Sequence, residues 1–160
     1  MKRIFVCVTV IALSLVTPGF LRAQSNSAIG TWKLNVAKSK WVNVQPPKSE
    51  TRTIETQGNG AKYTFEGVAA DGSHFEWGFT TNYDGKDSAI SGVGAPNGGD
   101  AEALTRVDAN TTKATTKKGA KLIQRTTAVV SSDGKVTILT SKGTNAQGHA
   151  TSSTTVFDKQ

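Results

Sequence analysis

The chain has 160 residues, 19 Lys and Arg against 12 Asp and Glu, and a single Cys. This length suits one domain with its own core, and 36% hydrophobic with 19% charged residues is typical of neither a disordered chain nor a membrane bundle. One cysteine excludes a disulfide scaffold and a cysteine-rich metal cluster within the chain.

Residues 1–23 have the layout of a secretory signal peptide. Lys2 and Arg3 precede an apolar run from Ile4 to Val16, and a small residue stands before an expected cut near Gln24. The apolar run is too short for a comfortable transmembrane span. We therefore expect an exported domain at residues 24–160, in the periplasm or outside the cell, with no transmembrane span after cleavage.

Cleavage would also change the composition. Loss of Lys2, Arg3 and Arg22 would lower the formal charge from +7 to +4, and loss of Cys7 would leave no cysteine. The exported domain would then be held by packing and hydrogen bonds alone.

The remainder of the chain reads as short strands joined by tight turns. Turn signals such as Asp71-Gly72, Asp84-Gly85 and Asp133-Gly134 recur along the chain, between segments rich in Thr, Val, Ile and aromatic residues. Helical periodicity is nearly absent, and its best candidate is a short turn around Val36 to Trp41. This pattern predicts an all-β, up-and-down antiparallel β-barrel of about 8–10 strands.

Alternation is clearest in the first half of the chain. Apolar side chains take every second position at Trp32–Val36, Tyr63–Phe65 and Phe75–Phe79, which places them on one face of each strand. In the second half apolar residues stand side by side, as at Leu122-Ile123 and Ile138-Leu139, so the two faces are not separated.

Three segments resemble the calycins, the barrels of the lipocalin and fatty-acid-binding-protein families. Ile29-Gly30-Thr31-Trp32-Lys33-Leu34 resembles their opening strand, in which the indole of a Gly-x-Trp motif plugs the closed end of the barrel. Thr155–Lys159 is similar to the last strand of fatty-acid-binding proteins, and Asp133–Thr137 to one of their late hairpins. The opening also resembles a group of small exported bacterial lipocalin-like proteins of unassigned function. The resemblance implies a barrel with a binding cavity.

The chain departs from these families at their anion-binding positions. Thr155 stands where fatty-acid-binding proteins carry an Arg before the final-strand aromatic residue, and no Arg follows Arg125 to cover the indole as in lipocalins. The segment from Val36 to Ser49 is too short for the two helices that fatty-acid-binding proteins insert there. Fatty-acid chemistry therefore does not transfer to this chain.

Gly30 and Trp32 are expected to form the structural plug of the barrel, with the glycine admitting the indole. The alternative is that Trp32 contacts a ligand. The plug interpretation predicts a large loss of stability when the indole is removed.

Five aromatic residues on two neighbouring strands offer a joint face that would either bind a ligand or form ordinary core. They are Tyr63, Phe65, Phe75, Trp77 and Phe79. Many Thr and Ser residues in the later strands would make the lumen partly polar, which favours an amphipathic ligand.

Arg106 and Arg125 each lie within an expected strand beside apolar neighbours. If they point inward, they would attract a ligand carboxylate or an internal acid. The alternative is that each faces solvent on the outer surface. We include both among the candidate ligand-binding residues.

Catalytic and metal chemistry have little support in the sequence. His74 and His149 are the only histidines, and no short-spaced cluster of His, Asp and Glu exists, so we predict no catalytic residue, metal or cofactor. The lysines between Lys113 and Lys121 lack interleaved aromatics, which indicates a solvated face rather than nucleic-acid binding.

The sequence thus favours an exported, monomeric binding protein that holds a small amphipathic or hydrophobic molecule in a barrel lumen. The alternative is a structural or interaction protein of the cell envelope whose barrel is packed solid. An enzyme would require one of the two histidines to meet an acid inside a pocket.

Overall fold

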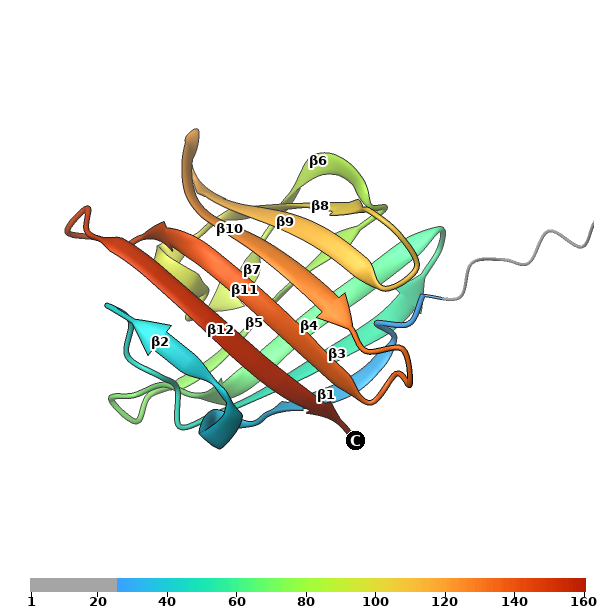
Figure 1. Ribbon diagram of the computed structural model, residues 1–160. Helices are drawn as coiled ribbons and strands as arrows, with labels where there is room; N and C mark the ends of the chain where they lie inside the picture. Colours follow the sequence, from blue (N-terminus) through green and yellow to red (C-terminus); the bar gives the residue numbers. More distant parts are fainter. Residues whose placement is uncertain (1–25) are drawn as a thin grey trace, which may run out of the picture.

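The computed structural model describes residues 26–160, so the predicted signal peptide lies outside the described residues. Antiparallel strands make up most of the described chain (Figure 1). Two 3-10 turns, η1 (Val36–Lys38) and η2 (Pro96–Gly98), complete it, and η1 falls where a short turn was expected. The strands are β1 (Gly30–Leu34), β2 (Lys40–Val42), β3 (Ser49–Gln57), β4 (Gly60–Val68), β5 (His74–Thr81), β6 (Asp84–Ala89), β7 (Ser91–Val93), β8 (Ala101–Arg106), β9 (Thr111–Lys118), β10 (Lys121–Val130), β11 (Val136–Thr144) and β12 (Ala150–Lys159).

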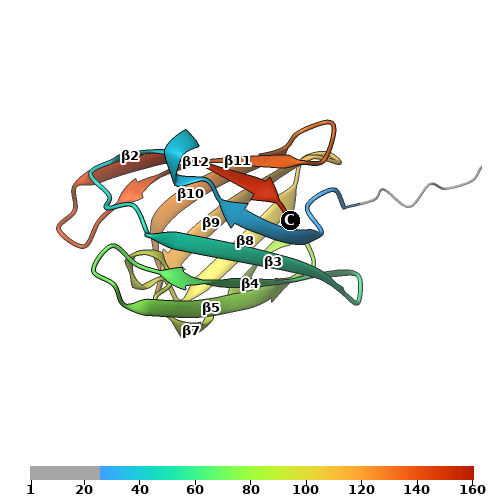
Figure 2. The same ribbon diagram turned by 90° about the horizontal axis from the view of Figure 1, so that it is seen from below.

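The strands form one sheet that curls into a nearly closed barrel (Figures 1 and 2). Its order is β6-β8-β9-β10-β11-β12-β1-β3-β4-β5-β7, in which β1 joins the meander of the second half to that of the first. The barrel and its antiparallel, up-and-down course confirm the predicted fold class. The short strand β2 lies off this path and pairs with β12.

The hydrogen-bonded sheet ends at a seam between β5 and β6. Although β6 follows β5 in the chain, it pairs with β8, while β7 returns to pair with β5. Among residues 26–160, the strand count of twelve exceeds the predicted 8–10, because β2 is an extra short strand and a break at Ile90 divides β6 from β7.

The N-terminal segment 26–29 closes one end of the barrel, where the C-terminus also lies (Figure 2). The Asn26 side-chain amide donates to the Tyr83 hydroxyl at 2.7 Å, and the Ser27 hydroxyl donates to the Ala109 carbonyl at 2.8 Å. Tyr83 follows β5 and Ala109 lies between β8 and β9, so these bonds tie the segment to the far side of the barrel.

Trp32 lies beneath this segment and is 1% exposed. Its indole N–H donates to the Ala28 carbonyl at 2.8 Å, and the Lys159 ammonium lies 5.0 Å from the ring centroid. The ammonium of Lys159 therefore lies over the face of the indole. A Cβ added at Gly30 would meet Lys159 Cε at 2.8 Å, so this glycine makes room for the lysine stem rather than for the indole, contrary to the expectation.

Candidate ligand-binding cavity

The barrel encloses a cavity of about 340 Å³, within the size range of small-molecule sites. Its floor includes Ala28 and Trp32 at the closed end of the barrel. Around the other end it is lined by Trp41, Pro47 and Pro96, which lie in β2 and in the connections that precede β3 and β8. The cavity therefore extends along the axis of the barrel.

One side of the cavity is an aromatic wall formed by Tyr63 and Phe65 of β4 with Trp77 and Phe79 of β5. The strand register pairs Tyr63 with Phe79 and Phe65 with Trp77. Both pairs are stacked, with centroid separations of 5.0 Å and 3.8 Å and an interplanar angle of 6° in each. Phe75, two residues before Trp77 on the same face of β5, is half-buried and also lines the cavity. Stacking fixes these rings as a flat apolar surface.

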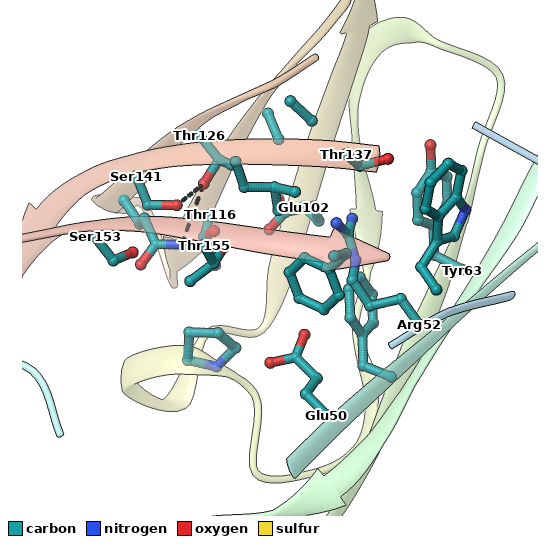
Figure 3. Close-up of a pocket in the computed structure, with 18 of the residues that line it drawn as sticks. Glu50, Arg52, Tyr63, Glu102, Thr116, Thr126, Thr137, Ser141, Ser153 and Thr155 are labelled. Carbon is teal, nitrogen blue, oxygen red and sulfur yellow. Dashed lines mark hydrogen bonds between the residues drawn. The ribbon is translucent and has the colours of Figure 1, made fainter. Parts of the chain in front are cut away.

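The opposite side is a polar wall from strands β9 to β12, part of which is drawn in Figure 3. Gln124, Thr126 and Ser141 form a chain there: the amide of Gln124 donates to the Thr126 hydroxyl at 3.3 Å, and the Thr126 and Ser141 hydroxyls are 2.9 Å apart. The members of the polar wall that carry a hydroxyl or amide are Thr112, Thr116, Gln124, Thr126, Thr137, Ser141, Thr151, Ser152, Ser153 and Thr155.

Three charged side chains line the cavity, and we call them the charged cluster: Glu50, Arg52 and Glu102. Arg52 is 7% exposed, and its guanidinium carbon lies 5.1 Å from the ring centroid of Phe65 and 5.0 Å from that of Phe157. Glu102 is also buried, whereas Glu50 is half-buried. The guanidinium is thus held between two aromatic rings inside the barrel.

Burial dominates the ionisation of the charged cluster. It raises the pKa of Glu102 to about 7, against the opposing effects of hydrogen bonding from Thr116 and of the Arg52 charge. Burial also raises the pKa of Glu50, again opposed by Arg52. The pKa of Arg52 is lowered by burial, although the nearby carboxylates favour its charged form, and an arginine remains charged at physiological pH.

The predicted site residues divide into two groups in the structure. The five aromatic residues all line the cavity, as does Trp32. Arg106 lies outside the cavity lining, half-buried, with its guanidinium carbon 4.2 Å from the ring centroid of Tyr83. Arg125 is exposed and also lies outside the lining. Arg125 therefore faces outward, the alternative that the sequence left open, because its neighbours Gln124 and Thr126 on β10 line the cavity. Arg106 is on the same face of β8 as the lining residues Glu102 and Leu104, but its guanidinium lies over Tyr83 rather than in the cavity lining.

Sequence reasoning missed the charged cluster. Arg52 stands between Thr51 and Thr53 in a strand without a large aromatic side chain, and Glu102 stands between two alanines, so neither resembles a buried position. A signal was available for Arg52, because it lies two residues before Ile54 and therefore on the same buried face of β3.

The described residues show no arrangement suited to metal chemistry. Within residues 26–160, no group of three or more His, Cys, Asp and Glu side chains could hold a metal ion. His74 and His149 are exposed, and neither belongs to the cavity lining. In the same part of the chain, no helix has the length and apolar character needed to cross a membrane.

Neither a family model nor a curated protein matches the chain. Among solved structures, it is similar to the crystal structure of zebrafish ileal bile acid-binding protein complexed with cholic acid. The match covers 84% of this chain and 99% of that chain, with 14% sequence identity and a TM-score of 0.48. The strand pairing itself gives a nearly closed antiparallel barrel, which is the fold that the resemblance in the sequence implied.

Proposed function

We propose that the chain is an exported binding protein that holds a small amphipathic molecule in the barrel lumen. The observation that carries this proposal is a cavity of about 340 Å³ between an aromatic wall and a polar wall. Apolar parts of a ligand would lie against the rings, while its polar atoms would meet the hydroxyls, amide and charged groups opposite. Export is supported by the pattern of residues 1–23.

The alternative, a structural protein with a solidly packed barrel, requires a filled lumen. A core at native packing density leaves few voids larger than a water molecule. A cavity of about 340 Å³ is many times larger than the space that one water needs. The volume therefore favours a binding role over the structural alternative.

Tryptophan fluorescence tests ligand binding directly, because all three tryptophans of the chain line the cavity. A panel of small amphiphiles should include one that changes the emission in a saturable manner and raises the melting temperature. No response to any member of a broad panel would contradict the proposal.

Two neighbouring residues of β10 provide a matched pair of variants for this test. Ala128 lines the cavity, whereas Val129 is 44% exposed on the outer face. Ala128→Phe should place a ring in the cavity and weaken binding, while Val129→Phe should leave binding unchanged. Equal affinities for both variants would show that the ligand lies elsewhere.

A further inference from the structure

The charges inside the lumen do not match an ionic ligand. Within residues 26–160, the charged side chains that line the cavity are one arginine, Arg52, and two acids, Glu50 and Glu102. Above pH 7, where Glu102 is mostly ionised, a ligand carboxylate would add to the negative charge of this buried space. A ligand ammonium would be attracted by the two carboxylates but repelled by the guanidinium, and either ionic head group would lose its hydration in a medium of low dielectric constant.

No close ion pair ties up these three groups. Over residues 26–160, neither glutamate has a carboxylate oxygen within 4.0 Å of a lysine or arginine nitrogen. Their mutual influence is electrostatic, since both carboxylates favour the charged form of Arg52. The three charges are therefore not neutralised by direct contact with one another.

In the part of the chain that the structure describes, three buried polar atoms of residues that line the cavity have no hydrogen-bond partner: Arg52 Nε, Glu102 Oε2 and Thr137 Oγ1. Arg52 and Thr137 both adjoin Phe157, since Arg52 lies over its ring and Thr137 is its cross-strand partner. In Figure 3 the guanidinium is directed toward the side of the cavity that holds Glu102 and Thr137, with Glu50 on the other side. Unpartnered buried polar atoms are destabilising, so a ligand that satisfies them gains affinity.

A hydroxyl group has the donor and acceptor capacity that these atoms require. Its oxygen can accept from the N–H of Arg52, and its proton can be donated to the carboxylate oxygen of Glu102 or to the Thr137 hydroxyl. A carboxylate has no proton to donate to Glu102, and an ammonium group has no lone pair to accept from Arg52. The hydroxyls of the polar wall would serve further hydroxyl groups of the same ligand.

We infer that the lumen selects a neutral amphiphile whose polar end carries one or more hydroxyl groups, in preference to a carboxylate or an amine of the same size. This inference rests on the proposed function and specifies the ligand class of the same cavity. The aromatic wall would bind the apolar part of that molecule, while Arg52, Glu102 and Thr137 would bind its hydroxyl end.

The test compares three ten-carbon probes that differ at the head group: 1-decanol, decanoic acid and decylamine. Each is titrated at pH 8 into the full-length folded domain with its tryptophan emission as the signal. We expect 1-decanol to bind about tenfold more tightly than either ionic probe, because each ionic head group would lose its hydration and leave either Arg52 or Glu102 without a hydrogen-bond partner.

The double variant Glu50→Gln and Glu102→Gln supplies the control for charge. It keeps the shape of both side chains and leaves Arg52 as the sole charge of the cavity lining within the described residues. Decanoic acid should then gain about tenfold in affinity and overtake decylamine. Circular dichroism tests whether the double variant is folded. If it does not fold, the single variant Glu102→Gln takes its place in the titrations.

The outcomes separate this inference from the proposed function. If decanoic acid or decylamine binds the unmodified protein as tightly as 1-decanol, the head-group selectivity is wrong while the binding function stands. If the glutamine variant shows no gain for decanoic acid, the charged cluster does not set selectivity, and the inference is overturned. If none of the probes binds and a broader panel also fails, the proposed function itself is contradicted.

Discussion

Removal of the Trp32 indole should destabilise the barrel strongly. The ring is 1% exposed, its N–H donates to the Ala28 carbonyl at 2.8 Å, and the Lys159 ammonium lies 5.0 Å from its centroid. Truncation of a buried tryptophan to alanine lowers the free energy of unfolding by about 3–5 kcal/mol. The lost hydrogen bond contributes about 1 kcal/mol within that range and places Trp32→Ala toward its upper end.

Urea denaturation followed by far-ultraviolet circular dichroism measures this loss without relying on tryptophan emission. Trp32→Phe is the matched control, because it keeps most of the buried ring but removes the indole N–H. We expect this control to lose about 1–2 kcal/mol, so that the alanine variant is clearly the less stable of the two. A loss below about 1 kcal/mol for Trp32→Ala would refute the view that this ring holds the closed end together.

Two further changes test the charges that the structure places inside and outside the lumen. Burial raises the pKa of Glu102 from 4.5 to about 7, so the folded protein binds this proton more tightly than the unfolded chain does. The contribution of this proton to the free energy of unfolding is therefore fully present below about pH 4.5 and is lost as the pH rises through 7. Glu102→Gln should remove that decline and make the domain up to about 3 kcal/mol more stable at pH 8. Urea denaturation at a series of pH values measures the effect, and identical pH profiles for the variant and the unmodified protein would contradict it. Arg125→Met should leave ligand affinity unchanged, because this side chain is exposed outside the cavity lining, and a tenfold loss in fluorescence titration would return Arg125 to the binding site.

The fold was predictable where large aromatic side chains alternate with polar ones. Tyr63 and Phe65 on β4, and Trp77 and Phe79 on β5, show both the strands and the inward face, because only one side of each strand is buried. The Gly-x-Trp motif located the first strand and the closed end. The partner of the indole could not be read in the same way, since Lys159 reaches Trp32 only through the pairing of β1 with β12.

A partly polar lumen was expected from the Thr and Ser content of the later strands, but the individual residues of the polar wall could not be identified from the sequence. Inward positions on β10 are Gln124, Thr126 and Ala128, whose side chains are as common on an outer surface as in a partly polar lumen. Arg52 was missed for a related reason, because its burial depends on Phe65 and Phe157 from strands far apart in the sequence. Division of the chain into a signal peptide and one exported domain remains a prediction from residues 1–23.

The claim that the lumen holds a small molecule is tested most directly by native mass spectrometry of the protein purified from its own host. The account predicts a noncovalent adduct that denaturing solvent releases, that Val129→Phe retains and that Ala128→Phe lacks. It also predicts that the measured polypeptide mass is that of a chain whose first residue lies near Gln24. A bare polypeptide in repeated gentle preparations, or an adduct equally abundant in Ala128→Phe, would contradict the claim.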